Sequence, residues 1–275
     1  MSDPLQFKDI MSLLNTANKT LDNNIYIPSL KADIASKTLN ANHTKNIIKT
    51  TVEGAFADNQ FTLIVYHILL DIFGDALNLE KLNIYDKEFI LLQLRSKNIR
   101  DDYEVILYNA NDEHISKTIS ISKHIEKIKK GVPAFEEQII DVTNNDTLYK
   151  IIINIPTIKE EYTFANNLYQ EKLSKIVEND AKQLKSLIAP MFLSHAAPFI
   201  EKIIIDTNEI DLTTLSVNER ISIVEQIPSK PLLSIIDKID TIYGKEMKTL
   251  THINKTMDGV IYSGRIAIDA NFFVN

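Results

Sequence analysis

The side chains that could perform catalysis or bind a metal ion form no recognisable constellation in this sequence. The chain has no cysteine, which excludes disulfides, thiolate nucleophiles and cysteine-based zinc sites. Its six histidines are scattered, and no two stand four residues apart as the helical zinc-protease motif requires. His114 and His124 flank a predicted strand, but no further ligand is evident beside them. We therefore predict no catalytic residue, no metal site and no bound cofactor.

The remaining chemical patterns have simpler structural explanations. Asp206 opens a segment like a calcium-binding loop, but Asp211 stands where that loop needs Gly and Val217 where it needs Glu. Adjacent carboxylates such as those of Glu136 and Glu137 point apart, so we expect them to be solvated rather than to act as an acid–base pair. The chain has six glycines and no Gly-rich motif, so a phosphate-binding loop is not expected.

The charge balance argues against nucleic acid and membrane partners. The net charge is −7, whereas a nucleic-acid binder needs a surplus of Lys and Arg. The one basic cluster, Lys123–Lys130, contains Glu126 and is typical of the solvated face of a helix. The longest apolar run, Phe61–Gly74, is too short to span a bilayer, and Met1–Pro4 does not look like a signal peptide. We expect a soluble protein that is made in a cytoplasm.

The first hundred residues have a helical periodicity. Apolar residues recur at spacings of three and four, which predicts helices over about 44–57, 59–73 and 84–97, after an amphipathic stretch that starts at Phe7. Gly74 is placed to end the helix before it. The helix over 84–97, capped by Asn83 with Asp86 at its third position, is apolar around most of its girth. We therefore expect that helix to be central and buried.

From Tyr103 onwards the apolar period changes to two, which is typical of strands. Strands are predicted near 103–107, 115–121, 138–142 and 148–155, the last two around a good hairpin loop. Because these four strands follow one another along the chain, we expect them to form one small antiparallel sheet.

The next part of the chain returns to helical spacing. A capping box followed by a long apolar stripe predicts one helix over 158–188, and a short helix is expected over 198–205. Ser216 begins a further helix that Pro228 closes, and one more helix is expected to end at Gly244.

The tail returns to a period of two, which predicts a β-hairpin from about Leu250 with its turn at Asp258 and Gly259. The predicted fold class is α+β, packed as one or two compact domains. Its regions are a helical N-terminal region over 1–100, a small antiparallel β-sheet over 101–156, a second helical region with a long helix over 157–246, and a C-terminal β-hairpin over 247–275.

Two stretches are familiar when they are taken together. The first, Leu79–Lys97, is a leucine-rich helix opened by Tyr85-Asp86-Lys87-Glu88 and closed by Leu94-Arg95-Ser96-Lys97, with a β-rich segment after it. The second, Leu215–Ser229, is a helix that ends in Glu225-Gln226-Ile227-Pro228-Ser229. Their order and spacing resemble the baseplate hub and hub-assembly family of T-even-type contractile-tailed bacteriophages.

The resemblance covers most of the chain from about residue 45, and a closing strand followed by Asn271-Phe272-Phe273 extends it to the end. The chain departs from the family at two places. Several family members carry paired cysteines, like those of zinc ribbons, where this chain has Asn109–Glu113 and Met257–Gly264. The corresponding hairpins must therefore hold by packing alone, and no metal-dependent role is expected here.

The resemblance implies a late phage protein of the virion, located in the tail baseplate and synthesised in the bacterial host cytoplasm. Its expected partners are other baseplate and tail proteins, with several copies of the chain around the tail axis. The resemblance also marks candidate family-motif or interface residues. These are Tyr85, Asp86, Glu88, Arg95, Glu225, Pro228, Phe272 and Phe273.

Plainer roles remain open for these residues. Asp86, Glu88 and Arg95 could simply cap their helix and form ion pairs near its ends. The Phe272-Phe273 pair could fill a partner's groove or tuck onto its own sheet. The strand over 260–268 could offer an edge to a partner strand or pack on its own core.

Three functional hypotheses follow. The preferred one is a structural subunit of the baseplate hub region that acts through protein–protein contacts without catalysis. The alternative is a chaperone of hub assembly that is absent from the finished virion. An unrecognised enzyme is the third hypothesis, and it would require a polar pocket assembled from residues far apart in the sequence.

Overall fold

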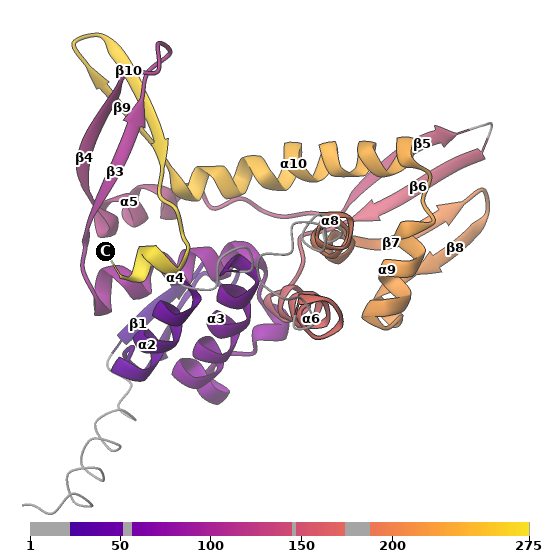
Figure 1. Cartoon of the computed structure of the whole chain (residues 1–275), viewed down its shortest axis with the longest axis horizontal. Helices are drawn as coiled ribbons and strands as arrows, with labels where there is room; N and C mark the ends of the chain where they lie inside the picture. Colours follow the sequence, from indigo (N-terminus) through magenta and orange to yellow (C-terminus); the bar gives the residue numbers. More distant parts are fainter. Residues whose placement is uncertain (1–22, 52–56, 145–146, 174–187, 275) are drawn as a thin grey trace, which may run out of the picture.

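The computed structural model describes residues 23–51, 57–144, 147–173 and 188–274, and it confirms the α+β class. Figure 1 shows a long helix, α10, with a β-sheet at each end and the remaining helices below it. The helices are α2 (Ala41–Thr50), α3 (Ala57–Phe73), α4 (Ile84–Asn98), α5 (Ile121–Ile128), α6 (Ile158–Glu171), α8 (Ile188–Ala196), α9 (Val217–Glu225) and α10 (Ser229–Thr251). The strands are β1 (Asn23–Ile27), β2 (Ala32–Ser36), β3 (Asp102–Tyr108), β4 (His114–Ser120), β5 (Gln138–Asn144), β6 (Thr147–Ile153), β7 (Ile200–Ile205), β8 (Asn208–Asp211), β9 (His252–Met257) and β10 (Val260–Arg265).

Helix α4 lies at the centre of the fold, as its sequence predicts. Asn83 caps it in a reciprocal box with Asp86, which confirms the predicted start. Ten of its fifteen residues are buried, including charged ones, so the helix has no solvent-facing side along most of its length. It packs against β1, α5, α6 and α10, which come from widely separated parts of the chain.

The strands form two four-stranded antiparallel sheets and one separate hairpin. The first sheet has the order β4-β3-β10-β9, the second has the order β5-β6-β7-β8, and β1 pairs only with β2. The prediction that β3, β4, β5 and β6 form one sheet is therefore wrong. Helix α5 and the segment after it separate the two hairpins, and each hairpin pairs with strands from later in the chain. The predicted C-terminal hairpin is confirmed as β9 and β10.

Two helix predictions in the second half are wrong. A helix is predicted over residues 198–205, but Ile200–Ile205 form β7, one of the two inner strands of the second sheet, where Ile200 and Ile203 are buried. The β-branched run favours a strand once β6 and β8 are available on both sides. The helix expected over 158–188 ends at Glu171 with Lys172 as its C-cap, and residues 174–187 lie outside the described residues.

Gly244 does not end its helix, contrary to prediction. Helix α10 continues to Thr251, which makes it about 34 Å long. A helix tolerates an internal Gly at a modest loss of stability, and here Gly244 has ordinary helical neighbours. The C-terminal end of α10 leads directly into β9, while an earlier part of the helix packs on β5 and β6 (Figure 1). One helix therefore connects the two sheets.

The β1–β2 hairpin lies within a region that the sequence analysis described as helical. Its turn places Lys31 at a positive φ of 52°, and Lys is not among the residues that mark such turns in a sequence. The amphipathic stretch that begins at Phe7 lies outside the described residues. The basic cluster forms α5 and the turn after it, with Ile121 and Ile125 buried.

Gly264 allows β10 to pair closely with β3. A Cβ atom at this position would lie 2.4 Å from the carbonyl oxygen of Ile106 and 2.8 Å from Cδ2 of Leu107. Both distances are far inside van der Waals contact, and a backbone carbonyl within a sheet cannot move away without breaking the strand pairing.

We predict that Gly264→Ala lowers the free energy of unfolding by about 1–3 kcal/mol, because the added methyl overpacks the junction between β10 and β3. Urea denaturation measures the change. Gly131→Ala is the matched control, since a Cβ there would meet no atom within 4 Å and the free energy should stay within about 0.5 kcal/mol. Equal stability of the two variants would contradict the close approach.

Candidate functional site

The predicted motif residues of α4 point into the protein rather than toward solvent. Asp86 has no exposed surface, and its carboxylate accepts hydrogen bonds from the backbone N–H of Ser29 (2.9 Å) and of Asn83 (3.1 Å). Burial raises the pKa of Asp86, and the two backbone donors oppose that rise. Asp86 therefore fastens the β1–β2 turn to the start of the central helix.

Tyr85 is a packing residue with a polar end. Its ring is 1% exposed and lies 5.2 Å from the ring of Phe135, centre to centre. Burial raises the pKa of Tyr85 to about 12, with a further contribution from the charge of Glu246. The phenol therefore stays neutral at physiological pH, which suits a core residue and not a general base.

A partly buried charge cluster around the buried Lys87 joins α4 to α6. Lys87 donates to both carboxylate oxygens of Glu161 at 2.6 and 2.7 Å, and its ammonium lies 3.3 Å from Glu88. Burial alone would lower the pKa of Lys87, but the two carboxylates raise it above its ordinary value. Burial raises the pKa of Glu88, as does the negative charge of Glu161, while Lys87 lowers it. Glu88 is one of the predicted motif residues, whereas Lys87, although it stands within the motif, and Glu161 are not among the residues predicted from the sequence.

Arg95 is a second fully buried charged residue of the α4 motif. It is fully buried, and its guanidinium donates to the backbone carbonyl oxygens of Phe272 and Asp102. The cation also lies over two rings, 4.9 Å from the centre of Phe272 and 5.2 Å from that of Tyr103. Burial lowers the pKa of Arg95, with the neighbouring charge of Arg100 acting in the same direction.

The structure buries both terminal aromatics, with Phe272 at 1% and Phe273 at 2% exposure. They lie in a short 3-10 helix, η8 (Ala270–Phe273), that packs against α2 and α3. The tail is therefore tucked onto its own chain, but it packs mainly on these two helices, and its contact with a sheet is that of Phe272 with Tyr103 of β3, 5.4 Å between ring centres. Of the two roles left open for the strand over 260–268, a free edge is excluded for β10, because it pairs with β3 on one side and β9 on the other.

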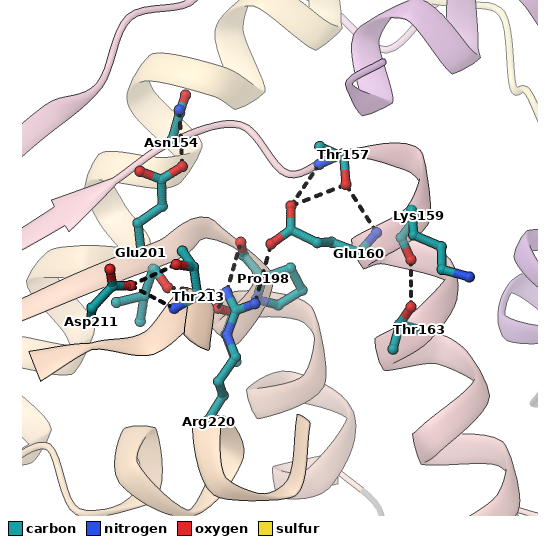
Figure 2. A network of polar contacts seen from close by, with 12 residues as sticks. Asn154, Thr157, Lys159, Glu160, Thr163, Pro198, Glu201, Asp211, Thr213 and Arg220 are labelled. Atoms are coloured by element: carbon teal, nitrogen blue, oxygen red, sulfur yellow. Dashed lines mark hydrogen bonds and ion pairs between the residues drawn. The ribbon is translucent and has the colours of Figure 1, made fainter. Parts of the chain in front are cut away.

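The second motif contains a buried arginine that the sequence analysis missed. Arg220 is 4% exposed and donates to Glu160 at 3.2 Å and to the carbonyl oxygens of Ala197 (3.3 Å) and Ile200 (3.1 Å). Figure 2 shows this side chain rising from α9 toward Glu160 at the start of α6. Its guanidinium also lies 5.0 Å from the ring centre of Phe164.

A compositional signal could have revealed these two arginines. The chain has 26 Lys but only 4 Arg, and Arg95 and Arg220 are both buried against backbone carbonyls. Arg suits such positions because its planar fork of donors reaches several acceptors and is more weakly hydrated than an ammonium group. The other two arginines, Arg100 and Arg265, are exposed, so the rarity of Arg marks candidates for a buried contact and does not identify the buried ones.

The other two predicted residues lie elsewhere. Glu225 is the exposed last residue of α9, and Pro228 is the N-cap residue of α10. Both lie at the junction between α9 and α10, and the structure does not bring them together with the motif residues of α4. Pro228 suits this junction because it has no backbone N–H with which to continue α9, and its φ of −55° is compatible with the start of α10.

Asp101 holds the first sheet to the end of α4. Its carboxylate accepts from the hydroxyls of Ser96 (2.5 Å) and Ser120 (2.6 Å), and from both the backbone N–H (2.7 Å) and the hydroxyl (2.9 Å) of Ser122. Desolvation alone would raise the pKa of Asp101, but these donors lower it to about 2. Helix α4, strand β4 and helix α5 therefore meet at one carboxylate.

A cavity of about 320 Å³ lies between α3, α6 and α8, with Asp58, Glu161 and His195 in its walls. Glu161 is already held by Lys87. Within residues 23–51, 57–144, 147–173 and 188–274, no group of three or more His, Asp or Glu is arranged to hold a metal ion. In the same ranges no helix is both long and apolar enough to cross a membrane.

The motif residues thus hold distant segments together, and the comparison with known families agrees with the resemblance drawn from them. A model of the T4 bacteriophage base plate protein family matches residues 27–256. The chain belongs to this family. No curated protein matched the chain, and no solved structure matched it. The match spans both motifs of the T4-type baseplate protein, including Arg95 and Arg220.

We predict that Arg95→Lys lowers the free energy of unfolding by about 2–3 kcal/mol, because one ammonium group cannot serve both carbonyls and leaves a buried acceptor unpaired. Urea denaturation followed by circular dichroism measures the loss. Arg100→Lys is the control, since Arg100 is exposed and should tolerate the exchange within about 0.5 kcal/mol. A neutral result at Arg95 would show that its contacts contribute little.

A second prediction concerns acid stability. The lowered pKa of Asp101 stabilises the native state above the unfolded-state pKa near 4, and this contribution is lost as the pH falls from about 4 to about 2. Asp101→Asn should therefore be less stable by about 1 kcal/mol at pH 7, a value reduced for the partial exposure of the site, and equal to the parent near pH 2. Denaturation at several pH values tests this, and parallel pH profiles for the two proteins would contradict it.

Proposed function

We propose that this baseplate protein is a structural subunit of the hub region of a contractile phage tail, held in the virion by contacts with other baseplate and tail proteins. The family match over residues 27–256 carries the proposal. In this reading the chain performs no catalysis, and several copies surround the tail axis.

The use of the motif residues supports a structural role. Four charged side chains of the motifs form hydrogen bonds inside the protein, and each connects a different part of the fold. They are Asp86, Lys87, Arg95 and Arg220. Large apolar side chains are exposed at separate places outside the core, among them Ile139 at 64% on β5 and Leu233 at 59% on α10. A subunit of a larger assembly needs such surfaces for its neighbours.

Peptide mass spectrometry on density-purified phage particles, compared with the lysate of infected cells, tests the proposal. We expect peptides of this chain in the particle at a fixed ratio to a known tail protein. Abundant peptides in the lysate with none in the particle would overturn the subunit proposal and favour an assembly chaperone that leaves before the virion is complete.

A further inference from the structure

Strand β5 is a free edge of the second sheet. It pairs with β6 on one side, and β6 is its only strand partner in the part of the chain that the structure describes. No further backbone hydrogen bond reaches Gln138–Asn144 among the described residues. Alternate residues of this seven-residue strand therefore present an N–H and a C=O that have no backbone partner. Figure 1 shows β5 at the end of α10 opposite to the first sheet.

The other edges of the two four-stranded sheets carry features that oppose a further strand. Lys117 lies within the edge strand β4, and Lys255 lies within the edge strand β9. The remaining edge strand, β8, has only four residues. Lysines within edge strands and very short edge strands both hinder strand addition. Strand β5 contains no Lys, Arg or Pro, and its pairing with β6 runs without a bulge. This unprotected edge is therefore the one on which a partner strand fits.

The side chains of β5 define what a strand beside it would contact. Ile140 and Val142 are buried. Ile139 is 64% exposed, and Asp141 and Thr143 are also exposed. Because side chains alternate along a strand, these last three lie on the side of the sheet away from the core. Helix α10 packs more extensively on β5 than on β6, so the helix lies beneath the edge of the sheet. An added strand would turn one side toward α10 and the other toward the neighbourhood of Ile139, so it needs apolar residues.

The charge of this edge narrows the choice of partner further. Glu136, Glu137 and Asp141 are exposed, and the segment 136–143 contains no Lys or Arg. The register places Lys150 of β6 on one side of Asp141, and the position on its other side is open. A second copy of β5 would bring carboxylates opposite a segment that has no cation. A strand with Lys or Arg opposite Asp141 would instead form a cross-strand pair of opposite charges, which is favourable.

We propose that β5 binds an extended basic segment of another protein by antiparallel strand addition. The segment places Lys or Arg opposite Asp141 and apolar residues opposite Ile139 and Ile140. Backbone hydrogen bonds supply the affinity in complexes of this kind, and the alternate side chains select the partner. This inference goes beyond the structural role proposed above, because it names a binding surface and the chemistry of what binds there.

Nuclear magnetic resonance of the isotope-labelled full chain tests the proposal with synthetic peptides. The basic peptide is Thr-Val-Lys-Val-Ile-Thr-Lys, whose lysines stand opposite Asp141 and Glu137 in an antiparallel register. The acidic peptide has Glu in place of both lysines. At concentrations up to about 2 mM, the basic peptide should shift the amide signals of β5 and leave those of β4 and β9 unchanged. The acidic peptide should bind about tenfold more weakly, because both charge pairs become repulsive.

Backbone methylation distinguishes strand addition from unspecific attraction. An added strand donates to β5 from the N–H groups of alternate residues only. The basic peptide is therefore made in two further forms, one methylated on its second, fourth and sixth backbone nitrogens and the other on its third, fifth and seventh. One form should bind like the unmethylated peptide, and the other should not bind.

Protein variants test the charge argument. Asp141→Lys should weaken binding of the basic peptide about two- to fivefold and strengthen binding of the acidic peptide by a similar factor. Asp141→Asn should weaken binding of the basic peptide less than Asp141→Lys does. Glu80→Lys, at an exposed site outside the second sheet, makes the same change in net charge as Asp141→Lys and should leave the binding of both peptides unchanged. Circular dichroism confirms that each variant is folded.

Three results would each overturn the proposal. They are no shift of the β5 signals with the basic peptide, equal binding of the basic and acidic peptides, and equal binding of the two methylated forms. Shifts of the β5 signals that depend on protein concentration without any peptide would show that a second copy occupies the edge, which also overturns it. The measurement uses purified protein, so its result does not depend on whether the chain is a virion subunit.

Discussion

The fold depends on one constraint, which is that helix α4 is enclosed on almost every side while it carries charged and polar residues. A buried polar group without a partner is costly, so each of these side chains must find an acceptor or donor inside the protein. Gln93 binds both the N–H and the carbonyl of Tyr26, Asp86 binds the N–H of Ser29, and Arg95 binds two carbonyls. The partners come from different segments, so satisfying one helix fixes the positions of several others.

Arg220 repeats the same arrangement at the second sheet. It joins α9, the start of α6 and the carbonyls that lead into β7. In both cases the guanidinium donates to main-chain carbonyl oxygens, which are present whatever the side chain, and also lies over an aromatic ring, which requires an aromatic residue at that position. The Nε atom of each arginine has no hydrogen-bond partner in the described part of the chain, so neither site is fully saturated. Each family motif therefore contains an arginine that joins segments far apart in the sequence.

The sequence revealed the local elements well and the long-range pairings poorly, for physical reasons. The caps of α4, α6 and α9 follow from residues three positions apart, and all three reciprocal boxes are present. The pairing of β3 with β10 joins segments more than 150 residues apart, and no local pattern encodes that choice. The local sequence of Ile200–Ile205 is compatible with either a helix or a strand, and its pairing with β6 and β8 decides for the strand. The destination of Arg95 was hidden for the same reason, because its acceptor Phe272 lies 177 positions further along.

That separation has a consequence for synthesis. A ribosome makes Arg95 well before the residues that will enclose it, so for most of translation the α4 cation has no Phe272 carbonyl to bind and no η8 to cover it. The β3–β4 hairpin likewise has no partner strand until β10, the last strand in the described part of the chain, has been made. The core around α4 therefore closes late, and a chain that stops short of η8 lacks both the Phe272 carbonyl that accepts from Arg95 and the Phe272 ring that covers its guanidinium.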